Sequence, residues 1–299
     1  MDAADRPRVL AVVGPTATGK SDLGVALARE VGGVVVNADS MQLYRGMDIG
    51  TAKLTAAERH GVPHRLLDVW DVTHTATAAE YQRLAREVID ALLADGVTPV
   101  LVGGSGLYLR AALDELSFPG TDPELRAELE AELEHSGALA LHARLAALDA
   151  AAAGRMEPTN GRRVVRALEV VLLTGAMPGA MTEYDGHYGV SYVGLDRPDL
   201  SARTDARVER MWAAGLVEEV RSLEARGLRD GVTASRALGY AQVLAMLDGT
   251  CDEPAAIEAT KVATRRFVRR QRAWFRRDPR VRWLDPDGDL LAQAIATVS

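Results

Sequence analysis

Cysteine is almost absent from the 299-residue chain, which holds only Cys251. A single cysteine excludes a disulfide within the chain and a zinc site built from several cysteines, and it fits a reducing compartment. Long apolar runs are also missing, and none approaches the ~20 residues that a membrane-spanning helix needs. The first eight residues are charged and do not resemble a signal peptide. We therefore expect a cytoplasmic protein that makes no contact with a membrane.

Basic residues are fewer than acidic ones, 35 against 42, but they are unevenly placed. Between Ala259 and Arg282, Lys261 and nine arginines stand against one acid, Asp278, so this segment carries a charge of +9. Such a basic segment indicates a polyanionic partner, although a solvated helix face explains the charge alone equally well. We expect the aromatic rings of this predicted helix, at residues 258–277, to lie mostly in the core.

A glycine-rich motif follows the first apolar run, residues 8–13, and precedes a predicted helix at residues 22–30. It reads Gly14, Pro15, Thr16, Ala17, Thr18, Gly19, Lys20, Ser21. In this setting the G-x-x-x-x-G-K-[ST] pattern is typical of a phosphate-binding loop, because glycines let several N–H groups point into one concavity at a helix N-terminus. Lys20 adds a full positive charge, and the Ser21 hydroxyl is a candidate ligand for Mg²⁺. A plain glycine-rich turn explains neither Lys20 nor Ser21.

Asp39 follows the second predicted strand, residues 33–37. In an open α/β sheet, ligands bind beyond the carboxyl ends of the strands, so Asp39 is expected at the same rim as the phosphate loop. We favour a catalytic role for this carboxylate over the alternative, which is to cap a helix that follows. Residues 63–69 read as a third strand, and His64 at its start is more consistent with a structural donor than with a base.

The fourth predicted strand, residues 98–102, lacks an acid at its end and runs into Gly103 and Gly104. Nucleotide hydrolases with this kind of loop use an acidic residue near the metal. The missing acid weakens that interpretation, with Asp68 and Asp71 as possible substitutes on another strand.

The overall pattern predicts an α/β fold: a P-loop NTPase-like parallel sheet flanked by helices. Residues 114–187 are rich in Ala, Leu and Glu without a convincing strand, so we predict a helical insertion there. Residues 1–113 and 188–299 would then form the catalytic core, with a fifth strand at 190–195 and only helices after it.

Taken in order, the motifs resemble those of the tRNA dimethylallyltransferase family over nearly the whole chain. The resemblance rests on the phosphate loop, on a long motif at residues 39–53, and on Pro63–His64. It continues through residues 103–108, 163–169 and 239–240, and ends with residues 264–276. The motif at 39–53 is far more specific than the phosphate loop, which many kinases share. Two departures, Glu157-Pro158-Thr159 and Arg65, lie away from the proposed chemistry.

The resemblance implies roles for individual residues. Residues 16–21 would hold the diphosphate of dimethylallyl diphosphate with Mg²⁺, Arg207 would reach it, and Asp39 would be the general base on the N6 amine of adenosine 37. Residues implied to contact the tRNA anticodon stem-loop are Asp39, Ser40, Met41, Gln42, Ser105, Arg126, Asn160, Gly161, Arg162 and Arg163. The alternatives left open are a P-loop kinase, an isopentenyltransferase acting on free adenine nucleotides, and a non-catalytic RNA-binding or switch protein. We expect a monomer.

Overall fold

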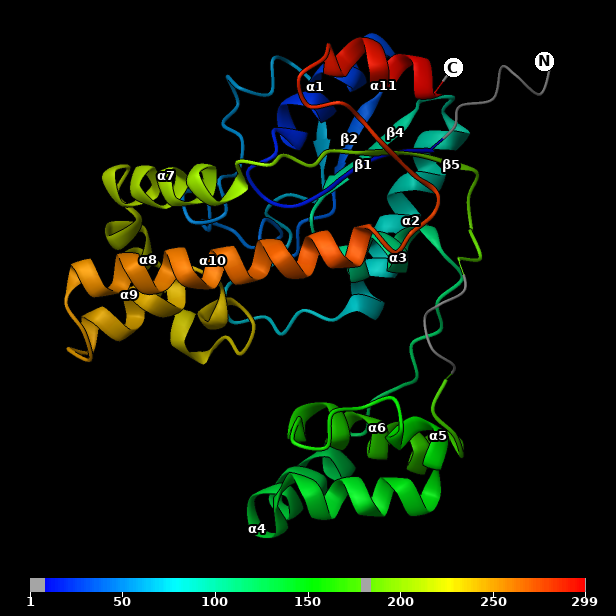
Figure 1. Ribbon diagram of the computed structural model, residues 1–299, viewed down its shortest axis with the longest axis vertical. Coiled ribbons are helices and arrows are strands. Elements are labelled where there is room, and N and C mark those ends of the chain that lie inside the picture. Colours follow the sequence, from blue (N-terminus) through cyan, green and yellow to red (C-terminus); the bar gives the residue numbers. More distant parts are fainter. Residues whose placement is uncertain (1–8, 179–183, 299) are drawn as a thin grey trace. The chain divides into compact units, whose positions relative to one another are not determined.

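The computed structural model of the protein describes residues 9–178 and 184–298. Its chain divides into two compact units, which we call the core unit (Met1–Asp114 with Gly186–Ser299) and the helical unit (Glu115–Asp185) (Figure 1). We expected no signal peptide at residues 1–8 because they are charged. These residues lie outside the described part of the chain. Among the described helices, none is both long and apolar enough to cross a bilayer.

A six-stranded parallel sheet forms the centre of the core unit, in the order β3-β2-β4-β1-β5-β6. The strands are β1 (Val9–Val13), β2 (Val34–Asn37), β3 (His64–Arg65), β4 (Pro99–Gly103), β5 (Val190–Gly194) and β6 (Val281–Trp283). The predicted α/β class with a parallel sheet is confirmed. Because the strands are parallel, their carboxyl ends meet at one edge, which is where the phosphate loop and Asp39 follow β1 and β2.

Alternating side chains of the strands pack against helices on both faces of the sheet. Leu10 and Val12 point to the face covered by α1 (Lys20–Glu30) and α11 (Leu290–Val298). Val9, Ala11 and Val13 point to the opposite face, against which α2 (Ala78–Ala94) and α3 (Gly106–Leu113) pack. Burial on both faces explains the nearly continuous apolar runs of β1 and β4.

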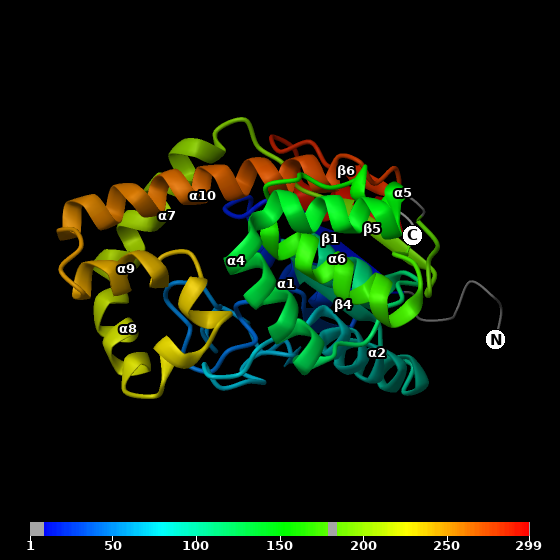
Figure 2. The ribbon, with the colours of Figure 1, turned by 90° about the horizontal axis from the view of Figure 1, so that it is seen from below.

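Helices of the C-terminal part complete the core unit. They are α7 (Leu200–Ala213), α8 (Leu216–Glu224), α9 (Tyr240–Leu247) and α10 (Glu253–Phe275), with short 3₁₀ helices η2 (Leu228–Asp230) and η3 (Ala234–Arg236). Helix α10 packs against α7, α9 and α3, and both ribbon views show it running along this part of the unit (Figure 2). It therefore connects the cluster α7–α9 with the edge of the sheet.

The described part of the helical unit consists of α4 (Pro123–Leu148), α5 (Ala150–Ala153) and α6 (Gly161–Thr174). Gly137, with φ 78° and ψ 165°, interrupts α4 with a kink between two helical segments. Asp122 and Asn160 cap α4 and α6 by accepting hydrogen bonds from backbone N–H groups of the first turn.

Two strand predictions were wrong. The third strand is only two residues long, because Leu66 and Asp68 adopt positive φ (60° and 58°), which ends the extended backbone. The C-terminal part is not entirely helical, since β6 pairs with β5 as the sixth strand. Its three residues include Arg282 and give too short an apolar signal to stand out in the sequence.

Candidate active site

The phosphate loop connects β1 to α1 and is held in a conformation that needs glycine. Gly14 has φ +142°, and a Cβ atom there would lie 2.2 Å from the Leu195 carbonyl oxygen. Gly19 has φ +93° and caps α1, so the N-terminus of this helix opens directly into the loop. Arg203 and Arg197 donate to the carbonyls of Ala17 and Thr18 at 2.8 and 3.2 Å, which fixes the outer side of the loop.

Lys20 is 8% exposed and lies inside the loop, where its Nζ donates to the Pro15 carbonyl at 3.2 Å. Burial lowers the pKa of Lys20 to about 8; the charge of Asp39 opposes this change and that of Arg207 adds to it. The Arg207 pKa is likewise lowered by burial. Two cations thus line one cavity, and neither forms an ion pair within the described residues, as expected of an anion-binding site.

A narrow cavity at the carboxyl edge of the sheet brings the predicted residues together. Its lining includes Thr16, Lys20, Ser21, Asp39, Gln42 and Arg207. Gln42 Nε2 and Arg207 Nη2 both donate to the Thr51 carbonyl at 3.1 Å, so α7 and the 39–53 segment meet at one atom. The phosphate loop after β1 and Asp39 after β2 therefore lie at one rim of the sheet, as predicted.

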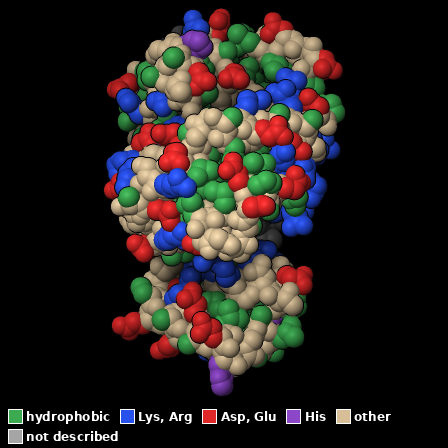
Figure 3. Space-filling view, turned by 90° about the vertical axis from the view of Figure 1, so that its left-hand side faces the viewer, with side chains coloured by type: hydrophobic (Ala, Val, Ile, Leu, Met, Phe, Trp, Pro, Cys, Tyr) green, Lys and Arg blue, Asp and Glu red, His purple; other side chains and the backbone are tan. Residues whose placement is uncertain are grey.

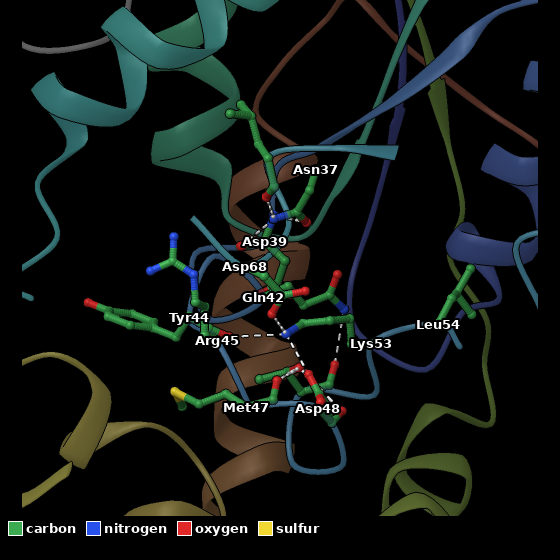
Figure 4. Close-up of polar contacts among 12 residues, drawn as sticks. Asn37, Asp39, Gln42, Tyr44, Arg45, Met47, Asp48, Lys53, Leu54 and Asp68 are labelled. Atoms are coloured by element: carbon green, nitrogen blue, oxygen red, sulfur yellow. Dashed lines mark hydrogen bonds and ion pairs between the residues drawn. The ribbon is translucent and has the colours of Figure 1, made fainter. Parts of the chain in front are cut away.

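Asp39 is positioned by Asn37, the last residue of β2. The Asp39 N–H donates to Asn37 Oδ1, and Asn37 Nδ2 donates to the Asp39 and Leu66 carbonyls, at 2.9 to 3.0 Å (Figure 4). Asp39 Oδ1 accepts from the Met41 N–H at 2.9 Å. No helix begins directly after Asp39, so the alternative role of capping a helix does not apply. The structural role of the side chain is limited to the turn that it closes with the Met41 N–H. Within the described residues its carboxylate makes no ion pair and keeps an oxygen available.

A second, wider cavity of about 300 Å³ adjoins the first and shares Thr16, Asp39, Thr51 and Arg207 with it. The remaining lining is more apolar and comes mainly from helices. It includes Met41, Ser105, Val208, Met211, Leu238, Tyr240, Phe267 and Arg270. Phe267 therefore lines a cavity, whereas Phe275, 4% exposed, is in the core as expected. The combination of an apolar wall with one carboxylate at its base suits an aromatic base and a short hydrocarbon.

Part of the 39–53 motif is structural. Lys53 Nζ contacts Asp48 and Asp68 carboxylates at 2.6 Å each and the Tyr44 carbonyl at 3.0 Å, with its side chain 4% exposed (Figure 4). Asp68 is therefore engaged, and Asp71 contacts Arg45 and Arg226 at 3.4 Å, so neither lines the cavities. His64 hydrogen-bonds the Val62 carbonyl at 2.9 Å, as a structural donor would, and it also lines the narrow cavity.

Sequence reasoning missed two residues that shape the site. Glu219 of α8 accepts from the N–H groups of Asp48, Ile49 and Gly50 at 2.7 to 3.2 Å and from the Tyr240 hydroxyl at 2.5 Å. Gln271 of α10 accepts from the N–H of Thr16 in the phosphate loop. Both act on backbone groups remote in sequence, so no local spacing indicates their partners, although Gln271 lies within the motif at residues 264–276.

The residues of the helical unit that were expected to contact tRNA differ in whether their side chains already have a partner in the protein. Arg126 pairs with the buried Glu169, which also contacts Arg166 at 2.6 Å. Asn160 caps α6 through the Arg163 N–H, and the side chains of Arg162 and Arg163 are exposed. Gly161 packs on Leu133, whose Cδ1 would lie 2.7 Å from an added Cβ. Arg126 therefore has a structural partner, while Arg162 and Arg163 are available for a ligand.

The basic residues of α10 separate into two sets. Lys261, Arg265 and Arg272 form ion pairs with acids of α7 and with Asp196. The other set has exposed side chains, lies on one helix face and makes no ion pair within the described residues; it consists of Arg266, Arg269 and Arg270. We call this set the arginine stripe. On the face shown in Figure 3, acidic and basic side chains are interspersed.

A parallel sheet whose first strand feeds a phosphate loop places the chain among P-loop-type α/β proteins. The IPP transferase family model matches residues 42–278. A Streptomyces coelicolor protein named tRNA dimethylallyltransferase is 65% identical over 289 residues, covering 94% of this chain and 91% of the relative. A Thermobifida fusca protein of the same name is 62% identical, with coverages of 97% and 94%.

Solved structures agree. The tRNA isopentenylpyrophosphate transferase of Bacillus halodurans has a TM-score of 0.72 at 40% identity, covering 97% of this chain and 94% of that one. A eukaryotic dimethylallyltransferase acting on tRNA has a TM-score of 0.80 at 24% identity, covering 97% and 76%, and supports the fold. The chain belongs to the IPP transferase family, and its two bacterial relatives above are named tRNA dimethylallyltransferases.

Proposed function

We propose that the protein transfers the dimethylallyl group of dimethylallyl diphosphate to N6 of adenosine 37 in tRNAs that read codons beginning with U. The products are N6-isopentenyladenosine and diphosphate. The observation that carries the proposal is that Lys20 of the phosphate loop and Asp39 line one cavity, in a chain that matches tRNA dimethylallyltransferases over nearly its full length. A leaving-group site and a base therefore face the same small space.

On the leaving-group side, the C–O bond to the allylic carbon breaks and its electron pair goes to the diphosphate. Lys20, Arg207 and the loop N–H groups are positioned to stabilise the charge that develops on these oxygens. Such pre-positioned donors in a buried site are usually the largest single contribution to catalysis. The loop here would stabilise a departing group, and no phosphoryl group is transferred.

On the nucleophile side, N6 forms a bond to the allylic carbon and loses a proton. The Met41 N–H holds Asp39 Oδ1, so the carboxylate has a fixed orientation with an oxygen left to accept that proton. A positioned general base of this kind contributes typically ~10²–10⁴-fold. Ser40, Met41 and Gln42 follow Asp39 directly and would seat the adenine beside it.

Mg²⁺ suits the oxygens available here. Ser21 lines the narrow cavity, and its hydroxyl has no hydrogen-bond partner among the described residues. Those residues contain no cluster of three or more His, Cys, Asp or Glu that could hold a metal alone. Mg²⁺ is commonly held by one or two protein oxygens together with substrate phosphates, so Ser21 and the diphosphate would form its site. When bound, it would neutralise charge on the leaving diphosphate.

RNA would approach from the side of the wider cavity. Phe267 and Arg270 line that cavity, and Arg270 also belongs to the arginine stripe. A target base must leave its stack to enter such a pocket, at a cost of a few kcal/mol. Phosphate contacts along the stripe would offset that cost. The anticodon stem-loop is the partner that this arrangement fits.

The function is tested with labelled dimethylallyl diphosphate offered together with tRNA, or with free AMP, ADP or ATP. We expect label in tRNA that carries adenosine 37 and none in the free nucleotides. Label in free nucleotides with tRNA ignored would contradict the proposal and favour a small-molecule isopentenyltransferase. Transfer of a phosphoryl group from ATP in the same assay would favour a kinase.

A further inference from the structure

The side chain of Gln271 joins two segments of the proposed active site that are far apart in sequence. Its Oε1 accepts from the Thr16 N–H of the phosphate loop at 3.0 Å, and its Nε2 donates to the Gly104 carbonyl at 2.8 Å. Gln271 is 6% exposed, so water competes little for these bonds. One amide group thus fixes the loop after β1 to the turn after β4.

The close fit around Gln271 depends on Gly104. A Cβ atom at Gly104 would lie 2.3 Å from Gln271 Nε2 and 3.3 Å from the Gly14 carbonyl oxygen. Any side chain there would push Gln271 away from the loop. The two backbones and the amide are therefore packed as one unit, which gives a role to the Gly103-Gly104 pair that replaces an acid at the end of β4.

The same turn is connected to the proposed base. Ser105, directly after Gly104, accepts a hydrogen bond from the Ser40 N–H at 3.1 Å and donates to the Ser40 hydroxyl at 3.2 Å. Ser40 is the neighbour of Asp39. A continuous path of hydrogen bonds and backbone therefore runs from Thr16 through Gln271, Gly104 and Ser105 to the segment that carries Asp39.

We propose that Gln271 is a positioning residue that sets the distance between the phosphate loop and Asp39. The inference rests on the proposed function, in which the leaving group sits on the loop and the nucleophile sits on Asp39. The transfer requires the nucleophile and the leaving group to lie in line on opposite sides of the allylic carbon. A misplacement of either by about 1 Å can cost ~10²-fold in rate. Gln271 itself need not touch either substrate.

Gln271→Met keeps the length of the side chain and removes both hydrogen bonds. We expect kcat to fall by about 10- to 100-fold and the binding of inorganic diphosphate, measured by calorimetry, to weaken. The Kd for tRNA should stay within about twofold, since the phosphate contacts that dominate RNA affinity lie elsewhere. Gln293→Met is the matched control, because Gln293 also bonds a backbone N–H and C=O, both of Asp285, but away from the site.

Gln271→Glu separates positioning from general destabilisation, also where Gln271→Met folds poorly. A protonated Glu has the donor and acceptor of Gln, whereas a carboxylate repels the Gly104 carbonyl. The ratio of its kcat to that of the wild type should rise as the pH is lowered. A flat ratio, or a folded Gln271→Met protein with wild-type kcat and diphosphate affinity, would overturn the inference. Failure of the proposed function would show differently, as a wild-type protein that makes no product.

Discussion

The ammonium of Lys20 and the carboxylate of Asp39 line one cavity without forming an ion pair within the described residues. Each charge is therefore left for a substrate: the cation for an anionic leaving group and the carboxylate for a proton. Because the two come from segments after β1 and β2, the parallel sheet itself creates this juxtaposition.

Binding of dimethylallyl diphosphate should weaken as the pH rises through about 8, the pKa to which burial lowers Lys20. Below that pH the free enzyme carries the ammonium that attracts the diphosphate, and above it the amine is neutral. The measurement is the Kd for dimethylallyl diphosphate from about pH 6.5 to about 9.5, a range that spans the Lys20 pKa. The Lys20→Met variant should bind dimethylallyl diphosphate more weakly, and its Kd should no longer depend on pH in this way. If the variant keeps the pH profile of the wild type, Lys20 is not the source of the pH dependence.

Asp39→Asn should bind tRNA like the wild type and lose most of its turnover, by about 10²-fold or more, because the amide cannot accept the N6 proton. Single-turnover transfer from labelled dimethylallyl diphosphate, with tRNA binding measured in parallel, separates the two effects. Asp71→Asn serves as the control, since its carboxylate is exposed and outside both cavities. Near-normal turnover of Asp39→Asn would show that the base lies elsewhere.

Glu219→Gln should disturb the wall of the wider cavity. The substitution removes the charge that three successive N–H groups and the Tyr240 hydroxyl share, and leaving such donors poorly satisfied costs about 1–3 kcal/mol. We expect a lower melting temperature and a higher KM for tRNA. Tyr240→Phe, which leaves the three backbone bonds in place, should have a smaller effect; equal effects would mean that the loop hydrogen bonds contribute little.

The arginine stripe should determine the salt dependence of tRNA binding. Replacing Arg266 and Arg269 by Gln should flatten the slope of log K against log[salt] by about 0.7–0.9 for each phosphate that is no longer neutralised. Arg83→Gln with Arg221→Gln makes the same charge change at exposed, acid-paired positions. If both double variants change the slope alike, the stripe has no special role and only net charge matters.

The sequence was sufficient for the fold class, the phosphate loop and the meeting of that loop with Asp39. These follow from local patterns: an apolar strand, a glycine loop, a helix, and a carboxylate after the next strand along the chain. The positive φ of Asp68, which shortens the third strand, and the pairing of β6 with β5 are set by tertiary contacts that no local pattern carries.

The supports of the site were not predictable in the same way. Glu219 and Gln271 act on backbone atoms 167 to 255 residues away. Their side chains bond N–H and C=O groups, which every sequence has, so the pattern of residue types holds no trace of the interaction. Arg126, which the family resemblance assigned to tRNA, lies against the buried Glu169, and only the structure could reveal that partner.

Mass spectrometry of nucleosides tests the central claim most directly. Unmodified tRNA that bears adenosine 37 is incubated with the enzyme, Mg²⁺ and dimethylallyl diphosphate, then digested, with a tRNA carrying another base at position 37 as the control. The account predicts N6-isopentenyladenosine in the first tRNA, located at position 37, and none in the second. Absence of this nucleoside from the first tRNA, with folded enzyme and both substrates present, would contradict it.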